Sequence, residues 1–337
     1  MKRISEIDGL RGIAAVCVML FHYTFAFNPG WSPGYLFHYG YMGVSLFFII
    51  SGFVISMSIT NGKSVLEFCY GRFIRLFPIY WIAIFITISA MFLAGLETEK
   101  LTTINILVNL SMFQRFLGFQ DIDGAYWTLA VELIFYFFLI ILIYFNKTER
   151  IIEYFLLLIF IVLALKIGLN YLLPNNYKVI KIINQFSFLH LFLAGIVFNK
   201  IYNSRFTKKD GFILLFCLLC NFGINLRFDI LVETIIIFFI IQMFLVLICY
   251  KNYLSFLNFP VFQFIGKISY PLYLLNENFG ATIFKGLNLY FDILLPVQIL
   301  IVSTIVMLTA TVLHFFIEVP IFSFLKKSTR ISAQIKG

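Results

Sequence analysis

The sequence predicts an all-α, polytopic membrane protein with about ten transmembrane helices. Of the 337 residues, 61% are hydrophobic and only 12% are charged, whereas soluble domains average about 45–50% apolar and about 25% charged residues. The apolar runs are about 20 residues long, which is the length that crosses a bilayer as a helix. The runs are also continuous, without the alternation of a membrane β-barrel. This composition excludes soluble enzymes, disordered chains and disulfide-rich mini-proteins.

Ten apolar runs have this length, and one further stretch is ambiguous. The stretch 104–119 is partly apolar but contains Asn105, Asn109, Gln114 and Arg115. If it does not span, cytoplasmic termini place most Lys and Arg on the inner side, as the positive-inside rule favours. We therefore expect 104–119 to lie at the outer face or to re-enter the membrane. The ten predicted spans are 11–28, 41–60, 74–95, 126–145, 151–172, 184–199, 211–226, 230–249, 260–283 and 293–316.

The chain is expected to form a single transmembrane domain over residues 1–325, followed by a basic cytoplasmic tail over 326–337. The net charge of +9 does not indicate nucleic-acid binding, because Lys and Arg lie in short loops rather than along one face. Cys217 and Cys220 form a C-x-x-C pair without a second ligand pair, so no metal site is expected. We expect a multi-pass protein of the cell inner membrane, with the lipid bilayer as a partner.

The first span contains two ionisable residues, Arg11 and His22. Eleven residues at about 100° each return His22 to within about 20° of Arg11, so both lie on one helical face. Ionisable residues inside a bilayer are costly when unpaired, and each is a candidate site. The pair is either an anion clamp with a general base, or a snorkelling arginine with a histidine hydrogen-bonded to a neighbouring helix.

The next two spans supply candidates for the cytoplasmic side. Arg72 and Arg75 lie three residues apart on one helical face at the inner entrance. Such a pair suits a phosphate-rich ligand, although on composition alone positive-inside anchoring is the simpler explanation. Ser51 and Gly52 are small residues in the middle of a span. They favour close helix packing over room for a ligand.

Polar groups also lie in three later spans. Glu132 lies about two turns into its span and cannot face lipid as a carboxylate, and Tyr136 shares its face. His314 and Glu318 are expected to pair near the inner surface in a structural role. A polar stripe within about 40° of one line on the span 260–283 must face protein or water. The stripe consists of Ser269, Tyr273, Asn276 and Gly280.

Seven short motifs follow one another between residues 8 and 320, and in this order they resemble the membrane-bound acyltransferase family 3. The motifs are Asp8-Gly-Leu-Arg11-Gly, Arg-x10-His, Phe-Phe-x-x-Ser-Gly-Phe, Arg-x-x-Arg-x-x-Pro, Trp-Thr-Leu-x-x-Glu, Ser-Tyr-x-x-Tyr-Leu and Glu-x-Pro. The resemblance implies an integral-membrane O-acyltransferase. Such an enzyme moves an acetyl or longer acyl group from cytoplasmic acyl-CoA to a hydroxyl, usually of a cell-envelope sugar.

The resemblance also implies that Arg11 and His22 are essential and that Arg72 and Arg75 serve the donor side. One position departs from the family, which often has histidine where this chain has Asn276. An amide can hydrogen-bond a substrate but cannot take a proton at physiological pH. His22 is therefore the main candidate for the base.

In the resulting hypothesis, the phosphates of acetyl-CoA bind Arg72, Arg75 and Arg11, and Ser51 belongs to the same donor-binding set. His22 then either deprotonates the acceptor hydroxyl or carries the acetyl group itself. Glu132 is a candidate to orient the imidazole.

Candidates for the acceptor glycan or glycolipid lie on the predicted outer side and in the polar stripe. Trp127, Asp121 and Asp123 suit stacking and hydroxyl hydrogen bonds, but they suit exposed interface anchors equally well. Ser269, Tyr273 and Asn276 are the candidates from the stripe.

Two other classes of protein stay open. A transporter or flippase for a lipid-linked sugar also has buried polar stripes and basic inner loops, but it predicts inverted repeats and helices broken at matching positions. A non-enzymatic sensor or assembly subunit would tolerate loss of His22. The acceptor hydroxyl, the acyl chain length and the oligomeric state do not follow from the sequence.

Overall fold

The computed structural model describes residues 4–28, 30–59, 64–95, 101–172, 177–224, 229–250 and 253–325. Throughout these ranges the regular structure is helical, which confirms the all-α prediction. Among the same residues, eight helical segments are long and apolar enough to cross a membrane. They are Ser5–Ala26, Pro33–Ile59, Val65–Leu93, Gly124–Tyr144, Thr148–Leu169, Ile182–Asn203, Ile230–Cys249 and Leu295–Leu325. The predicted tail at 326–337 lies outside the described residues.

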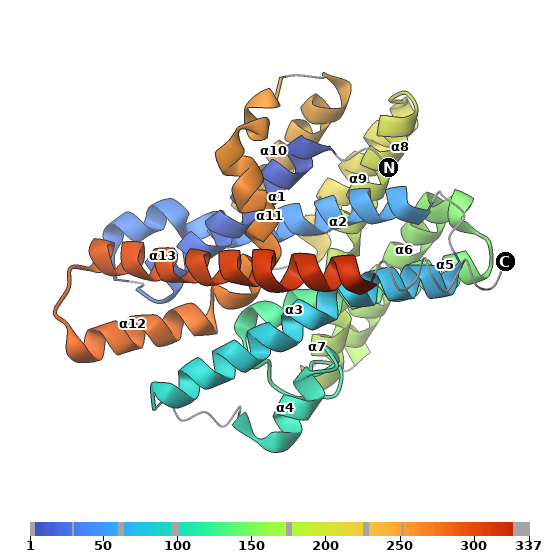
Figure 1. The fold of residues 1–337 in the computed structure, drawn as a ribbon. Helices are drawn as coiled ribbons and strands as arrows, with labels where there is room; N and C mark the ends of the chain where they lie inside the picture. Colours follow the sequence, from blue (N-terminus) through green and yellow to red (C-terminus); the bar gives the residue numbers. More distant parts are fainter. Residues whose placement is uncertain are drawn as a thin grey trace. The chain divides into compact units, whose positions relative to one another are not determined.

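Two of the ten predicted spans differ from the prediction. The span expected at 211–226 is helix α9, Lys208–Ile224, whose 17 residues are at the short end of the range that crosses a bilayer. The span expected at 260–283 is broken into α11, Pro260–Leu275, and α12, Asn278–Tyr290 (Figure 1). At this break the Asn278 N–H donates to Asp123 Oδ2 at 2.8 Å.

The stretch 104–119 does not span, as predicted. It begins with the short helix α4, Thr103–Asn109, whose first turn is capped by the Thr102 side chain. Seven residues of helix cover only about 10 Å, far less than the hydrocarbon core. The chain then runs through turns to the 3₁₀ turn η4, Gly124–Tyr126, which leads into α5, Trp127–Tyr144.

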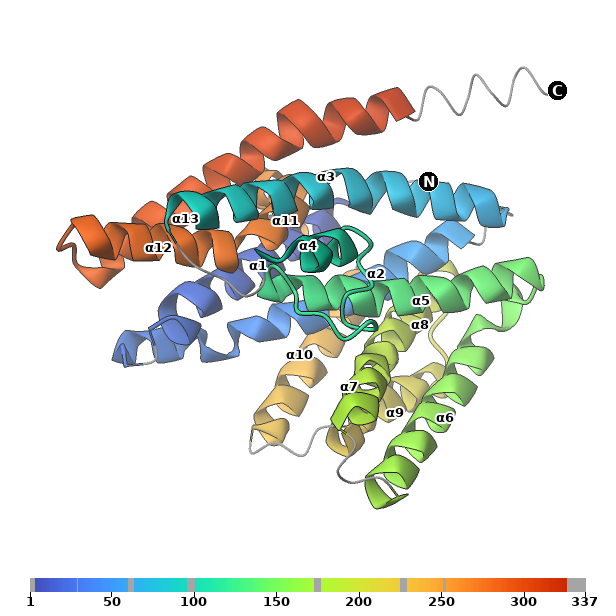
Figure 2. The same ribbon diagram turned by 90° about the horizontal axis from the view of Figure 1, so that it is seen from below.

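The chain divides into two compact units. Unit 1 consists of Met1–Ala14, Tyr41–Val65 and Thr128–Gln263. Its helices include α2 (Gly43–Ile59), most of α5, α6 (Ile151–Leu172), α7 (Tyr177–Gln185), α8 (Leu189–Asn203), α9 and α10 (Ile230–Cys249). Helices α6, α7, α8 and α9 lie side by side within this unit (Figure 2).

The core of unit 1 is the contact between α2 and α8. Gly52 on α2 lies against the Phe192 carbonyl, and Gly195 on α8 lies against the Ile49 carbonyl, so closely that a Cβ on either glycine would collide with backbone. Close approach of backbones through small residues is the usual way in which membrane helices associate. The expected packing role of the small residues in this span is therefore confirmed for Gly52.

Unit 2 consists of Ala15–Gly40, Leu66–Trp127 and Phe264–Gly337. It contains the second part of α1 (Ser5–Phe21), the π-helical turn η1 (His22–Ala26), most of η2 (Ser32–Met42), most of α3 (Val65–Leu93), α4, most of α11, α12 and α13 (Leu295–Leu313). Helices α12 and α13 pack against each other (Figure 1). Two tyrosine hydroxyls tie α3 to its neighbours: Tyr80 donates to the Asn109 carbonyl and Tyr270 donates to the Leu76 carbonyl, both at 2.8 Å.

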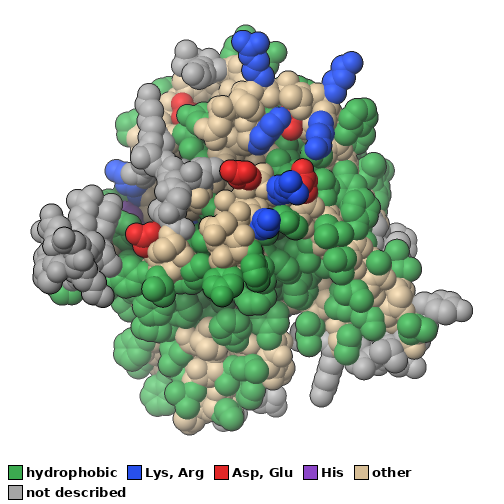
Figure 3. Space-filling view, turned by 90° about the vertical axis from the view of Figure 1, so that its right-hand side faces the viewer, with side chains coloured by type: hydrophobic (Ala, Val, Ile, Leu, Met, Phe, Trp, Pro, Cys, Tyr) green, Lys and Arg blue, Asp and Glu red, His purple; other side chains and the backbone are tan. Residues whose placement is uncertain are grey.

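Large apolar side chains remain exposed on the helices of both units. Phe92 and Leu93 of α3 are 79% and 85% exposed, and Phe239 of α10 is 64% exposed. Hydrophobic side chains, green in Figure 3, cover much of the face shown. Such surfaces are unfavourable in water and suit contact with lipid chains.

Candidate active site

His22 lies where the regular α-helix of the first span ends. The chain continues from α1 into the π-helical turn η1, in which the Phe27 N–H donates to the His22 carbonyl at 2.9 Å. Single π-helical turns occur frequently at functional sites because they re-aim side chains. The His22 imidazole is bordered by the rings of Phe21 and Phe27, with centroids 5.2 and 5.7 Å away.

The carboxylate beside His22 is that of Glu277. His22 Nε2 lies 3.7 Å from Glu277 Oε2, and the side chains are 14% and 25% exposed. Glu277 stands at the break between α11 and α12. The sequence analysis did not select it, although the rule that an ionisable residue in a predicted span is a candidate site would have found it.

Gly124 provides the space for the Glu277 carboxylate. A Cβ at Gly124 would collide with both carboxylate oxygens. In the same way, a Cβ at Gly280 on α12 would collide with the Tyr23 hydroxyl, which is fully buried and has no hydrogen-bond partner. Two glycines therefore accommodate polar side chains next to His22.

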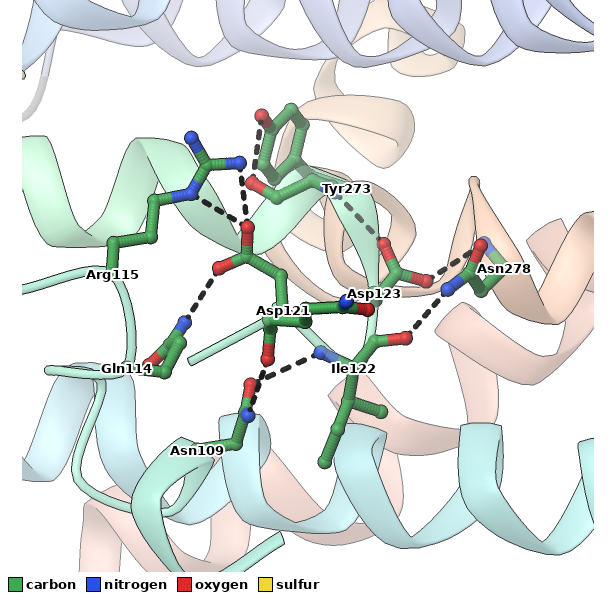
Figure 4. A network of polar contacts seen from close by, with 10 residues as sticks. Asn109, Gln114, Arg115, Asp121, Ile122, Asp123, Tyr273 and Asn278 are labelled. Carbon is green, nitrogen blue, oxygen red and sulfur yellow. Dashed lines mark hydrogen bonds and ion pairs between the residues drawn. The ribbon is translucent and has the colours of Figure 1, made fainter. Parts of the chain in front are cut away.

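Asp123 fastens this loop to the helix break. Its side chain is fully buried, Oδ1 accepts the Ala125 N–H at 3.0 Å and Oδ2 accepts the Asn278 N–H at 2.8 Å (Figure 4). The Asn278 side chain donates in return to the Ile122 carbonyl at 2.5 Å. The alternative that Asp123 is an exposed interface anchor is wrong, because its carboxylate is buried and accepts from backbone N–H groups.

The preceding loop is also ordered by side chains (Figure 4). Asp121 accepts from Arg115 Nε at 2.6 Å and from the Gln114 amide at 2.9 Å. Asn109 donates to the Gln120 carbonyl and accepts the Ile122 N–H. These partners cannot be deduced from sequence, since the loop has no periodic pattern that pairs them.

Trp127 begins α5 directly after this loop and is half-buried. The Arg115 guanidinium lies 5.8 Å from the centre of the Trp127 ring, within the range of a cation–π contact. Asp121 thus holds the arginine that covers the ring. Trp127, a predicted acceptor residue, thus has its aromatic ring beside an ordered polar loop.

The polar stripe of α11 faces protein. Ser269 donates to the Gly266 carbonyl at 2.8 Å, Tyr273 to the Ala125 carbonyl at 3.3 Å, and the Asn276 amide to the Tyr273 carbonyl at 2.5 Å. All three side chains are buried. Asn276 Oδ1 is the buried acceptor of the stripe that has no hydrogen-bond partner.

The predicted donor residues fall in both units. Arg72 and Arg75 are half-buried on α3 in unit 2, and the Arg72 guanidinium lies 5.7 Å from the Phe68 ring. Arg11 belongs to unit 1, where its guanidinium lies 3.8 Å from Asp8.

Glu132 and Ser51 also belong to unit 1 and contact each other. The Ser51 hydroxyl donates to Glu132 Oε1 at 3.2 Å, and the Tyr136 hydroxyl donates to the same oxygen. The sequence hypothesis assigned Glu132 to orient the imidazole. In the structure, the carboxylate in contact with His22 is Glu277, and Glu132 has hydroxyl partners.

His314 and Glu318 pair as predicted, with 2.7 Å between Nδ1 and Oε2. His314 begins a second π-helical turn, η8 (His314–Glu318). Over the described ranges, no group of three or more His, Cys, Asp or Glu side chains is arranged to hold a metal ion.

The comparison with protein families shows to which family the chain belongs. The family described as "Acyltransferase domain" matches residues 4–316. The chain belongs to the membrane-bound acyltransferase family 3. The match includes His22, Gly124 and Glu277, so the geometry above lies inside the family domain.

Three relatives are similar to this chain. O-acetyltransferase OatA of Staphylococcus aureus is 26% identical over 375 residues, which cover 97% of this chain and 59% of that protein. Nodulation protein 10 of Rhizobium leguminosarum bv. viciae is 32% identical over 160 residues, 39% of this chain and 42% of that protein. Peptidoglycan O-acetyltransferase OatA of Listeria monocytogenes is 28% identical over 154 residues, 40% of this chain and 23% of that protein.

The chain therefore spans less than two thirds of the length of each of these relatives. No solved structure matches this chain.

Proposed function

We propose that this protein is an integral-membrane O-acetyltransferase of the cell inner membrane. It moves an acyl group from cytoplasmic acyl-CoA to a hydroxyl of a cell-surface or lipid-linked carbohydrate. The observation that carries the proposal is the pairing of His22 with a carboxylate inside the matched acyltransferase domain. The names of two relatives, both called O-acetyltransferases, support the choice of acetyl and hydroxyl.

The chemistry requires a base next to the thioester. His22 takes the proton of the acceptor hydroxyl, the hydroxyl oxygen bonds to the thioester carbonyl carbon, and the carbon–sulfur bond breaks. The proton then passes from the imidazolium to the departing CoA sulfur, which restores the neutral base. In the relay version, the imidazole nitrogen bonds to the thioester carbonyl carbon as the carbon–sulfur bond breaks, and the imidazole N–H proton passes to the CoA sulfur. The acceptor oxygen then bonds to the acetyl carbon as the carbon–nitrogen bond breaks, and the acceptor's proton returns to the imidazole.

The donor side is assigned to arginines. Arg72 and Arg75 lie one turn apart on α3, and guanidinium groups bind phosphate oxygens through paired N–H donors. Arg11, and Ser51 on α2, complete the proposed donor set. With the termini in the cytoplasm, these residues meet the CoA phosphates from the inner side.

The acceptor side is assigned to Trp127 and the α11 stripe. The Trp127 ring, which the Arg115 guanidinium contacts, is assigned to stack against a sugar. The hydroxyls of Ser269 and Tyr273 donate to backbone carbonyls. We therefore assign these two residues to shaping the acceptor side of the site. Asn276 Oδ1 is available to accept a hydrogen bond from a substrate hydroxyl.

The test uses purified protein in nanodiscs with radiolabelled acetyl-CoA and soluble peptidoglycan fragments. Wild type should transfer label to the glycan and release CoA, whereas His22→Gln should do neither. His38→Gln, a histidine elsewhere in unit 2, is the matched control and should behave as wild type. Equal transfer by wild type and His22→Gln would refute the assignment of the base.

The donor assignment has its own experiment. Arg72→Ala and Arg75→Ala should each raise the KM for acetyl-CoA about tenfold or more, since a lost charged hydrogen bond costs about 1.5–3 kcal/mol. An unchanged KM in both variants would overturn the donor site.

A transporter for a lipid-linked sugar is the second candidate. The break between α11 and α12 favours it, because broken helices line the substrate sites of many transporters. Reconstituted protein that moves a fluorescent lipid-linked sugar across vesicles, without acetyl transfer, would support this function instead.

A further inference from the structure

We propose that Glu277 is a positioning residue for His22, and that position 124 is glycine because the Glu277 carboxylate fills the space of its Cβ. The inference rests on the proposed function and deepens it, because it assigns the carboxylate that acts together with the general base His22.

The first step is the electrostatic relation between the two side chains. The distance of 3.7 Å between Nε2 and Oε2 is longer than an ordinary hydrogen bond. It is close enough for an ion pair once the imidazole is protonated. When the imidazole takes a proton from the acceptor, a positive charge forms in a site bordered by aromatic rings. A carboxylate at this distance stabilises that charge, and more so where water is scarce.

The second step is how the carboxylate is held. Glu277 is the N-cap residue of α12, and its carbonyl accepts the Ala281 N–H at 2.8 Å. Its side chain makes no capping hydrogen bond to the helix. The carboxylate therefore does not cap the first turn of α12. It lies between Gly124 and His22.

The third step concerns Gly124. Its backbone does not have the positive φ that favours glycine, in contrast to Gly95 and Gly118, whose φ values are 62° and 80°. The requirement for glycine is therefore steric. A methyl group at position 124 would push the carboxylate away from its place beside His22.

The fourth step is the rigidity of the frame. Asp123 accepts the N–H groups of Ala125 and Asn278, which flank Gly124 and Glu277 respectively. The backbone atoms that carry the two residues are thus joined through one buried carboxylate. If the Glu277 side chain is displaced, the backbone at residue 277 cannot move with it unless these hydrogen bonds break.

The test measures acetyl-CoA turnover with the peptidoglycan fragments in nanodiscs for two Glu277 variants and two glycine variants. Glu277→Gln keeps the size and removes the charge, and it should lower kcat about 100-fold with an unchanged KM for acetyl-CoA, the loss typical of a misplaced catalytic group. Glu277→Asp keeps the charge and should recover part of kcat. Gly124→Ala should match Glu277→Gln, whereas Gly286→Ala on α12, with no atom within 4 Å of its added Cβ, should be unchanged.

A double variant tests the contact itself. In the Glu277→Ala background the space is empty, so Gly124→Ala should cause no further loss of kcat or of melting temperature. Additive losses would overturn the steric part of the proposal, and a normal kcat in Glu277→Gln would overturn the positioning role. Absence of turnover in wild type would instead refute the proposed function. The melting temperatures of the Glu277→Ala and Gly124→Ala single and double variants would still test the contact between the two residues.

Discussion

Two pairs of glycines, one pair in each unit, have different roles. In unit 1, Gly52 and Gly195 let the backbones of α2 and α8 touch, and an added Cβ would collide with backbone carbonyls. In unit 2, Gly124 and Gly280 make room for the Glu277 carboxylate and the Tyr23 hydroxyl. One pair packs helices, and the other pair seats polar side chains beside His22.

This difference separates stability from activity. Backbone in the middle of a packed helix cannot move away from a new methyl group, so a substitution in unit 1 should act on folding. The Glu277 carboxylate is the end of a flexible side chain and can rotate away, so a substitution at Gly124 should act on the site. Three further experiments follow from this comparison.

The largest effect is expected at the centre of the α2–α8 contact. Gly195→Ala should destabilise unit 1 by about 3 kcal/mol or more, a typical upper value for overpacking, despite the gain of about 1 kcal/mol that alanine normally brings to a helix. Gly168→Ala on α6, with no atom near its added Cβ, should show that gain. Thermal unfolding of detergent-purified protein measures both. If Gly195→Ala melted at or above the wild-type temperature, the close approach of the two helices would be disproved.

A smaller effect on stability is expected at Tyr23. Its hydroxyl is buried without a hydrogen-bond partner, and leaving such a group unsatisfied costs about 1–3 kcal/mol. Tyr23→Phe should therefore raise the melting temperature, and it should partly relieve the loss caused by Gly280→Ala. Melting curves of the two single variants and the double variant test this coupling. Strict additivity of the two changes would show that the hydroxyl and Gly280 do not interact.

The smallest effect is expected at Asp210, which lies outside the eight candidate membrane segments and pairs with Lys200 near the end of one of them. Burial by itself raises the pKa of Asp210, but hydrogen bonds from Lys200 and Thr207 outweigh it and hold the pKa below the ordinary 3.8. A lowered pKa gives stability that is present above the ordinary value and is lost as the pH falls through the folded-state value. Asp210→Asn should cost about 1 kcal/mol at pH 7, and the difference from wild type should shrink below pH 3.8. Melting temperatures across pH 3–7 measure it, and a pH-independent difference would contradict the assignment.

The helical class, most spans and the i, i+4 pair of His314 and Glu318 could be predicted from the sequence. These features depend on local composition and on helical spacing, both of which are visible in a single chain. The small residues around Gly52 predicted close packing for the same reason.

The break at Asn276 and Glu277 was not predicted, and the hydrogen bond made there joins Asn278 to Asp123, 155 residues earlier in the chain. The pairing of His22 with Glu277 likewise joins distant parts of the chain. Helical spacing placed Arg11 and His22 on one face, but it contains no information on which distant carboxylate meets the imidazole. Glu132 was the candidate chosen from its depth in a span, and its partners, Ser51 and Tyr136, lie on its own unit.

The central claim is that the carboxylate of unit 2, and not that of unit 1, serves the reacting histidine. The most direct measurement compares kcat for acetyl-CoA turnover in Glu277→Gln and Glu132→Gln. Both changes remove one charge and keep the side-chain size, and glutamine at 132 can still accept from the Ser51 and Tyr136 hydroxyls. We predict a loss of about 100-fold in Glu277→Gln and a loss of less than tenfold in Glu132→Gln. The reverse order would contradict the claim and return the positioning role to Glu132.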